Sequence, residues 1–406
     1  VHTLYPCFSP LDNLRVHGTN AVMDVHSRYP AIDDLRHKAR KRIPAFVWEY
    51  LDSATGMEQT KARNRARLDE IGFLPSILHG EVKPDLSTKF LGHTRPLPFG
   101  IAPVGMSGLM WPDSETILAR AARHAQIPYT LSTVASQSPE DLAPSIGEDA
   151  WFQMYPPRDE DIRRDMLARA RSAGFSTLVL TVDVPVASRR ERQTRSGLTQ
   201  PPRLTPRLLS QVARCPVWAA GMAVRGMPRM RGLAKYTPKT TTALSSTQHA
   251  GYLLRTSPDW DYVSWLRDHW TGPFIVKGVL RAEDAQPLKD RGIDAIWVSN
   301  HAGRQFDAAP ATIDALRSLR AATTLPLIFD SGVEGGLDIL RAFACGANFV
   351  MLGRAFHYAV AALGPNGVPH LIDILEKDLQ ANMGQLGSKS LSELPPPFDL
   401  GSSPLL

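Results

Sequence analysis

The sequence predicts an α/β protein, a (β/α)8 TIM barrel with an N-terminal helical segment and a long loop insertion after the fourth strand. Three observations support this fold. About eight short β-rich runs alternate with helical patterns along most of the chain, and this alternation implies parallel strands joined by crossover helices. Polar residues or glycine end nearly every run. One connection is far longer than the others.

The predicted strands are short runs rich in β-branched and aromatic residues. In chain order they are PFGIAPVG, PYTLSTVA, WFQMYP, FSTLVLTVD, PFIVKGV, AIWVSN, PLIFDSGV and FVMLGRA. The predicted helices between them carry apolar residues at helical spacing, and several end on glycine. They are SETILARAARHAQ, SPEDLAPSI, DEDIRRDMLARARSAG, DYVSWLRDHW, RAEDAQPLKDRG, ATIDALRSLRAAT and GLDILRAFACG.

Upstream of the barrel, the stretch YPAIDDLRHKARKRIPAFVWEYLDSA predicts an amphipathic helix broken at Pro44, because proline lacks the amide proton that a helix interior uses. Residues 1–27 show no periodicity and are predicted to be a disordered or non-native extension. We expect residues 28–390 to form the barrel domain and residues 391–406 to form a C-terminal tail. Residues 184–258, rich in Arg, Pro, Gly and Thr, are predicted to be a lid, with a solvated insertion as the alternative.

The composition limits the class of protein. With 406 residues, 43% hydrophobic and 21% charged, the chain can bury a large core. Its formal charge of +6 suits an anionic substrate, an anionic membrane surface or nucleic acid, but no zinc-finger or RNA-binding motif favours the last. The three cysteines are far apart and odd in number, so we expect neither disulfides nor a metal site. Without an apolar run of roughly 18 residues, a cytoplasmic protein is expected, with contact at the inner face of the cell membrane left open.

The residues at the predicted strand ends are chemically distinctive. In a TIM barrel the carboxyl ends of the strands converge on one face, where the chemistry takes place. A ring of hydrogen-bonding groups that includes one lysine, one histidine and two carboxylates predicts a lined cofactor pocket. The residues at these ends are Gly105, Ser132, Gln153, Tyr155, Thr181, Asp183, Lys277, His301, Asp330, Gly353 and Arg354.

The stretch SNHAGRQFD at 299–307 carries a family resemblance. It is close to the fingerprint SNHGGRQLD of the FMN-dependent L-2-hydroxy-acid oxidases and dehydrogenases. Ala302 and Phe306 replace a Gly and a Leu. Further matches are IPAFVWEYLDSA, IAPVGMSG, LSTVAS, WFQMYPPRD, LTVDVP, VKGV, DSGV and LGRAF. The chain resembles the bacterial L-lactate dehydrogenase branch most closely, since Val134 stands where the glycolate oxidase branch carries an aromatic residue.

This resemblance implies the oxidation of a small L-2-hydroxy acid, L-lactate first, to the 2-oxo acid. His301 would be the base that removes the hydroxyl proton, because imidazole changes protonation near neutral pH. Asp183 would orient His301 and stabilise its protonated form. The substrate carboxylate and hydroxyl would be held by Tyr50, Tyr155, Arg190 and Arg304, with Arg189 as the alternative to Arg190.

The resemblance also implies FMN as the cofactor, a quinone-like electron acceptor and a homotetramer. Lys277 would lie beside flavin N1 and O2. In the family an arginine that contacts the FMN phosphate stands where this chain has Glu334, so we expect Glu334 to turn outward and FMN to be held less tightly. The predicted FMN-binding residues are Pro103, Val104, Gly105, Ser132, Gln153, Thr181, Lys277, Ser299, Asp330, Gly332, Gly353 and Arg354.

Three alternatives stay open on the sequence alone. The chain could be an oxidase that uses O2 and acts on glycolate, mandelate or a longer hydroxy acid. It could be an FMN isomerase of the isopentenyl-diphosphate type, although such an enzyme is not expected to carry the His301 and Arg304 pair. It could also be a catalytically silent flavin-binding protein.

Overall fold

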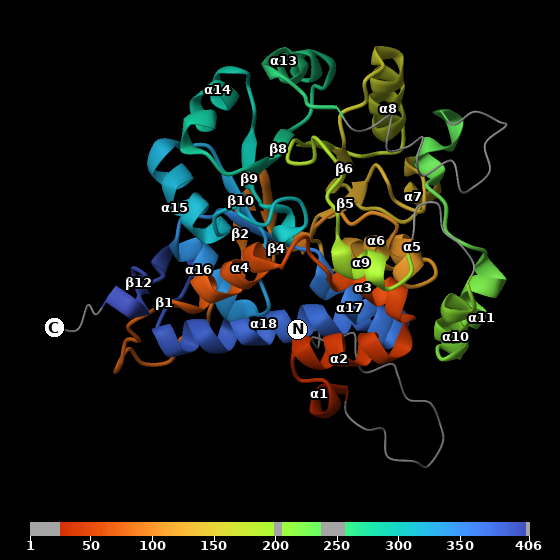
Figure 1. The fold of residues 1–406 in the computed structure, drawn as a ribbon. Helices are drawn as coiled ribbons and strands as arrows, with labels where there is room; N and C mark the ends of the chain where they lie inside the picture. Colours follow the sequence, from red (N-terminus) through yellow and green to blue (C-terminus); the bar gives the residue numbers. More distant parts are fainter. Residues whose placement is uncertain (1–24, 199–204, 237–255, 403–406) are drawn as a thin grey trace, which may run out of the picture.

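Eight parallel strands form a closed barrel at the centre of the computed structural model, which describes residues 25–198, 205–236 and 256–402 (Figure 1). Each barrel strand pairs with the next in the chain, and the last pairs with the first. All eight predicted strands are confirmed. They are β4 (Phe99–Ile101), β5 (Tyr129–Ser132), β6 (Ala150–Met154), β7 (Thr177–Thr181), β8 (Phe274–Val279), β9 (Ala295–Val298), β10 (Leu327–Phe329) and β11 (Phe349–Leu352).

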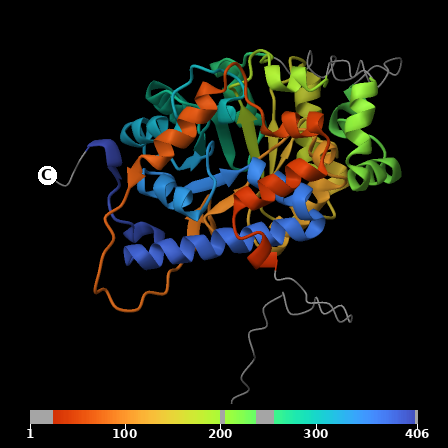
Figure 2. The same cartoon turned by 60° about the horizontal axis from the view of Figure 1, so that its bottom comes forward.

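Helices surround the barrel, and the predicted crossover helices are confirmed (Figures 1 and 2). In α8, Asp159 caps the first turn by accepting from the amide of Ile162, while Met166 and Leu167 are buried. The helices that follow the barrel strands are α5 (Ser107–Met110), α6 (Ser114–His124), α7 (Pro139–Leu142), α8 (Glu160–Ser172), α13 (Trp260–His269), η2 (Ala282–Asp284), α14 (Ala285–Asp290), η3 (His301–Gly303), α15 (Thr312–Ala322), α16 (Gly336–Ala344), α17 (Arg354–Leu363), η4 (Gly364–Asn366) and α18 (Gly367–Leu386).

Aromatic residues fill the amino-terminal end of the barrel. A hairpin of β2 (Thr88–Phe90) and β3 (His93–Arg95), which the sequence did not predict, places Phe90 against Phe349, with the ring centroids 5.1 Å apart. The guanidinium of Arg95 is buried beside the hairpin and donates to Asp149 at 2.6 Å. The carboxyl ends of the strands are therefore the end of the barrel left for a ligand.

Short helices precede the barrel: α1 (Val25–Arg28), α2 (Ile32–Arg42), α3 (Ala45–Asp52) and α4 (Gln59–Asp69). Pro44 lies between α2 and α3, so the predicted break is confirmed. Helix α2 packs along α17 (Figure 1). The helical chain begins at Val25, slightly before the predicted boundary at residue 28; residues 1–24 lie outside the described residues.

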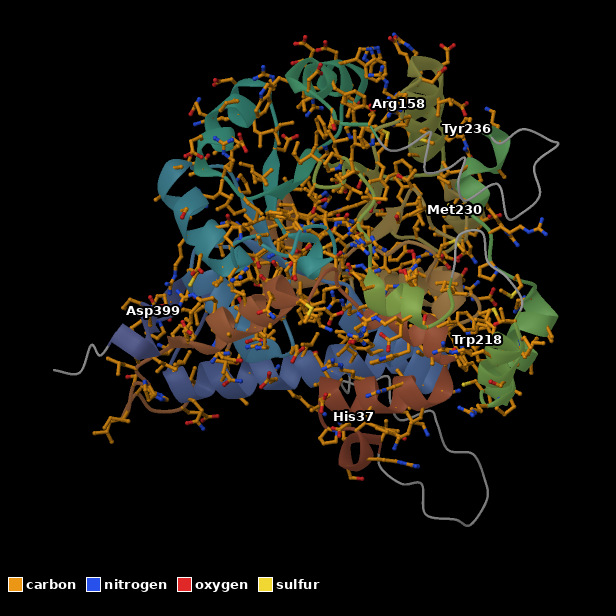
Figure 3. The ribbon with its side chains drawn as sticks, viewed as in Figure 1. His37, Arg158, Trp218, Met230, Tyr236 and Asp399 are labelled. Atoms are coloured by element: carbon orange, nitrogen blue, oxygen red, sulfur yellow. The ribbon has the colours of Figure 1, made fainter. Side chains whose placement is uncertain are left out.

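The insertion after β7 is described in part. It contains α9 (Glu191–Arg195), α10 (Pro206–Ala213), α11 (Pro216–Arg225) and η1 (Arg231–Tyr236). Trp218 donates from Nε1 to the carbonyl of Leu109 at 2.9 Å, and the Tyr236 hydroxyl donates to Asp165 at 2.5 Å (Figure 3). These bonds attach the described part of the predicted lid to the side of the barrel. Residues 199–204 and 237–255 of the lid lie outside the described residues.

The segment predicted as a C-terminal tail contacts the body of the protein. It contains η5 (Leu391–Glu393), β12 (Phe398–Asp399) and η6 (Leu400–Ser402). Strand β12 pairs antiparallel with β1 (Ile71–Gly72), and Asp399 accepts from Arg317 at 2.9 Å. Residues 391–402 are therefore part of the fold, and residues 403–406 lie outside the described residues.

Candidate active site

A cavity of about 330 Å³ lies where the carboxyl ends of the barrel strands meet the N-terminal helices. Cofactor and small-molecule sites typically have volumes of roughly 300–1,000 Å³. Its lining combines strand-end residues with residues of α2, α3, α4 and α17. The predicted site residues that line it are Tyr50, Pro103, Val104, Gly105, Tyr155, Arg190, Lys277, His301, Arg304, Asp330, Gly332, Gly353 and Arg354.

The other five predicted residues lie next to the lining rather than in it. Asp183 contacts His301, and Ser299 accepts from Lys277 at 2.7 Å. Ser132 donates to the side chain of Gln153 at 2.9 Å. Thr181 pairs with Lys277 across β7 and β8.

His301 is fixed by its backbone and by a carboxylate. Its φ of 54° lies in the left-handed region, and its amide donates to the hydroxyl of Ser299 at 3.1 Å. Its Nδ1 lies 3.2 Å from both carboxylate oxygens of Asp183. Gly278 permits this approach, because a Cβ there would lie 2.6 Å from the Asp183 Cβ. A carboxylate can only accept, so Asp183 holds the proton on Nδ1 and leaves Nε2 able to accept one.

The surroundings of this pair favour a neutral histidine and a charged carboxylate. Burial lowers the pKa of His301 below its ordinary value, although Asp183 raises it. Burial also opposes the charge of Asp183, but His301 and Lys277 bring the pKa of that carboxylate below its usual range. The lowered pKa of His301 favours an unprotonated imidazole at neutral pH.

Two arginines and two tyrosines line the cavity together with His301. Arg190 lines the cavity, whereas the side chain of Arg189 is 87% exposed, which favours Arg190 of the two candidates. The Tyr50 hydroxyl donates to the carbonyl of Gly105 at 3.2 Å. Burial raises the pKa of Tyr155, and the charge of Asp183 adds to this effect, so its phenol keeps its proton.

Arg304 connects the strand ends to the N-terminal helices. Its guanidinium donates to the carbonyls of Leu51, Ser53 and Tyr50 at 3.1, 2.9 and 2.8 Å. These carbonyls belong to the C-terminal turn of α3, whose last carbonyls have no partner within the helix. Burial and the nearby charge of Arg190 lower the pKa of Arg304. An anion between these two arginines would relieve the repulsion.

Lys277 is buried in the wall of the cavity. Its Nζ lies 2.7 Å from the Ser299 hydroxyl and 3.4 Å from the carboxylate of Asp330. The Trp297 indole donates to the same carboxylate at 2.9 Å. This network holds one ammonium at a fixed place beside the cavity.

A cluster that the sequence did not reveal lines the same cavity. Asp52 is 2% exposed, and its carboxylate contacts Arg36, Lys61, Arg192 and Tyr358 at 3.1, 3.2, 3.1 and 2.8 Å. All of these except Arg192 line the cavity. The members of this cluster that line the cavity come from the N-terminal helices and from α17. The placement of strand ends in a barrel therefore gives no prediction for them.

Glu334 lies at the edge of the cavity and is exposed.

Comparison with known proteins places this site in a family. The sequence profile described as FMN-dependent dehydrogenase matches residues 39–398. The chain belongs to this family. It is 38% identical over 367 residues to an L-lactate dehydrogenase of Ectopseudomonas mendocina, and this match covers 90% of this chain and 97% of the relative. An L-lactate dehydrogenase of Pectobacterium atrosepticum is also 38% identical, over 370 residues, with 90% and 95% covered.

Solved structures agree with this assignment. The crystal structure of the monotopic membrane protein (S)-mandelate dehydrogenase has a TM-score of 0.86 and 33% identity, and the match covers 91% of this chain and 99% of that one. A mandelate oxidase structure has a TM-score of 0.74 and 32% identity, with 90% and 96% covered. The protein is thus an FMN-dependent 2-hydroxy-acid oxidoreductase with a TIM-barrel fold.

The chemistry of the cavity fits FMN. The amide nitrogen Nε2 of Gln153 and the hydroxyl of Thr181 are buried without a hydrogen-bond partner in the structure. Buried polar groups are normally paired, and the polar edge of an isoalloxazine ring offers both donors and acceptors. Six cations and four carboxylates are among the lining residues, which leaves a net positive charge for an anionic cofactor and an anionic substrate.

Proposed function

We propose that the protein oxidises small L-2-hydroxy acids, L-lactate first, to the corresponding 2-oxo acids. The observation that carries this proposal is the partly buried pair of His301 and Asp183, 3.2 Å apart, at a cavity that two arginines also line. A base that is neutral at pH 7 and a site for a carboxylate are what this substrate class requires.

The residues have separate tasks. Arg190 and Arg304 hold the substrate carboxylate, for which planar guanidinium groups are suited. Tyr50 and Tyr155 hydrogen-bond to the carboxylate or the hydroxyl. His301 accepts the hydroxyl proton on Nε2, and Asp183 stabilises the imidazolium that forms. When bound, FMN would accept the two electrons of the C2–H bond as that bond breaks and its hydrogen leaves as hydride or as a proton, and Lys277 would provide a fixed positive charge beside it.

The remaining predicted residues hold FMN. Ser132, Gln153 and Thr181 are assigned to the edge of the ring, with Ser299 positioning Lys277. Pro103, Val104 and Gly105 are assigned to its face, Asp330 to the ribityl chain, and Gly332, Gly353 and Arg354 to the phosphate. A Cβ at Gly105 would lie 2.6 Å from Val134 and 3.6 Å from the Tyr50 hydroxyl, so this wall has no room for a larger residue.

The choice of L-lactate rests on this crowded wall and on the names of the relatives. Val134 is partly buried in the cavity lining beside Gly105. The structural neighbours are named for mandelate, so a phenyl group at C2 is the strongest competitor for the methyl group of lactate.

The test is flavin reduction without oxygen. Purified holoprotein is mixed with L-lactate, D-lactate, glycolate, L-2-hydroxybutyrate or (S)-mandelate, and the loss of the oxidised flavin absorbance is followed. We expect the fastest bleaching with L-lactate and none with D-lactate. Faster bleaching by (S)-mandelate would overturn the choice of substrate, and no bleaching by any acid would favour a silent flavin protein.

We further infer that a quinone-like carrier at a membrane accepts the electrons. Exposed apolar residues on and after α10 and α11 are interspersed with exposed arginines: Leu209, Val217, Val224 and Met227 with Arg207, Arg214, Arg225, Arg229 and Arg231. Such a surface suits an anionic bilayer, because each cation close to the bilayer contributes about 1 kcal/mol to the binding free energy. A neighbour described as a monotopic membrane protein supports this inference. Among the described residues, no helix has the length and hydropathy of a membrane span.

Sedimentation with vesicles tests the membrane contact. We expect binding to vesicles of phosphatidylserine and phosphatidylcholine at low salt, weakened by Val224→Asp and by high salt. Rapid reoxidation of the flavin by air together with no vesicle binding would favour an oxidase. A homotetramer, the assembly implied by the family resemblance, would be tested by light scattering.

A further inference from the structure

Asp52 contacts three cations, Arg36, Lys61 and Arg192, and these cations also have other carboxylates nearby. Arg192 is matched by Glu49 at 2.6 Å and Glu58 at 2.9 Å. Asp52 shares its negative charge between Arg36 and Lys61, and Asp33 lies 4.0 Å from Arg36. Glu58 lies farther from Lys61, at 3.8 Å. Arg36 and Lys61 both line the cavity, so both cations lie within reach of a ligand bound there.

Arg354 is a third cation that lines this part of the cavity, together with Arg36 and Lys61. It donates to the carbonyl of Ala302 at 2.8 Å, and no carboxylate lies within 4.0 Å of it among residues 25–198, 205–236 and 256–402. Burial lowers the pKa of Lys61, and the nearby charge of Arg354 lowers it further. Burial opposes the charge of Asp52, but Lys61, Arg354 and Arg36 hold the pKa of that carboxylate well below its usual range. The three cations are therefore close enough to act on one group.

The backbone around Arg354 is also suited to an anion. Gly353 is the N-cap residue of the ten-residue helix α17, and Gly353, Arg354 and Ala355 all line the cavity. Amide groups in the first turn of a helix have no partner within the helix. The loop after β10, by contrast, brings the carboxylate of Glu334 to the edge of the cavity. The three cations of this part of the cavity, Arg36, Lys61 and Arg354, belong to α2, α4 and α17.

We propose that Lys61 and Arg36, together with Arg354, bind the phosphate of FMN, and that Asp52 positions Lys61 and Arg36 for this task. This inference deepens the proposed function and rests on its assignment of the cavity to FMN. The N-terminal helices thereby supply cofactor-binding cations to a barrel whose β10 loop offers a carboxylate. Lys61 also donates to the backbone carbonyl of Asp52 at 2.8 Å, which restricts its side chain.

The test compares FMN with riboflavin, which has the same ring system and ribityl chain but no phosphate. Apoprotein is prepared by removing the flavin, and the dissociation constant for each flavin is measured from the quenching of flavin fluorescence. We expect Lys61→Met to weaken FMN binding about 10- to 100-fold, which corresponds to about 1.4–2.8 kcal/mol, the range typical of a charged hydrogen bond. Riboflavin binding should not change. Arg36→Met should have the same selectivity with a smaller loss, since Arg36 is more exposed.

Two variants serve as controls. Lys61→Arg keeps the charge and should retain most of the preference for FMN. Lys41→Met removes the same charge from an exposed place on α2 outside the cavity, and should leave both constants unchanged. Equal losses for FMN and riboflavin in Lys61→Met, or no loss for either, would overturn the inference while leaving the proposed function intact. Wild-type protein that bound neither flavin would overturn both.

Discussion

The two halves of the cavity are built differently. The half around His301, Asp183 and Lys277 consists of strand-end residues of one barrel, held by hydrogen bonds between neighbouring strands and loops. The half around Asp52 and Lys61 consists of helices that precede the barrel and dock onto it. Arg304 joins them by binding three carbonyls of α3 and the residue after it. We infer that the first half performs the chemistry and that the second half retains the cofactor.

We expect the largest effect of a substitution at His301, the proposed base. This substitution tests whether the first half of the cavity performs the chemistry. His301→Ala should slow anaerobic reduction of the flavin by L-lactate about 10²- to 10⁴-fold, the contribution typical of a general base. FMN content should stay near the wild-type value, because His301 belongs to the chemical half. Stopped-flow absorbance measures the rate. His124→Ala, at the exposed end of α6, is the control. Reduction of His301→Ala at the wild-type rate would break the assignment.

The two halves also differ in how well the sequence predicted them. The strand-end residues were predicted because the parallel strands of a barrel place their carboxyl ends on one face. Residues far apart in sequence are therefore expected to lie close together there. Lys61 and Arg36 follow no such rule, since charged residues on amphipathic helices are usually solvated, and only the docking of α2 and α4 turns them toward the cavity. The hairpin that plugs the barrel was missed for a similar reason. Its strands are only three residues long, and no hydrophobic alternation develops over that length.

The next largest effect is expected at Arg304, the residue that connects the two halves of the cavity. Arg304→Lys keeps a positive charge but loses the planar fork that reaches the carbonyls of α3. We expect KM for L-lactate to rise about 10- to 100-fold, as for the loss of a charged hydrogen bond, and FMN to dissociate faster because α3 is held less firmly. Steady-state kinetics and flavin release by gel filtration measure these changes. A rise in KM without faster release would show that the halves are independent.

A pH profile tests the chemical half alone. Catalysis needs neutral His301, whose pKa lies below its ordinary value of 6.5 mainly because of burial. The acid limb of kcat/KM should therefore lie below about pH 6.5, with a tenfold loss for each further pH unit. Since Asp183 raises the pKa of His301, Asp183→Asn should move this limb to lower pH while reducing the rate at the plateau. Asp268→Asn, exposed on α13, should leave the limb in place. A limb above pH 6.5 in the wild type would contradict the effect of burial.

The smallest effect is expected at Glu334, which lies at the edge of the retaining half. Its carboxylate is exposed, and Arg36 is close enough to feel its charge: burial lowers the pKa of Arg36, but Asp52, Tyr358 and Glu334 together raise it above the ordinary value. Two unit charges about 4 Å apart in water interact by roughly 1 kcal/mol. Glu334→Gln should therefore tighten FMN binding about two- to fivefold and leave riboflavin binding unchanged, and Glu334→Arg should tighten it further. Glu283→Gln, on the exposed surface of η2, is the control for net charge. If removing the charge of Glu334 weakened FMN binding instead, Glu334 would be holding Arg36 in place for the phosphate, and the retaining half would depend on a carboxylate at its edge.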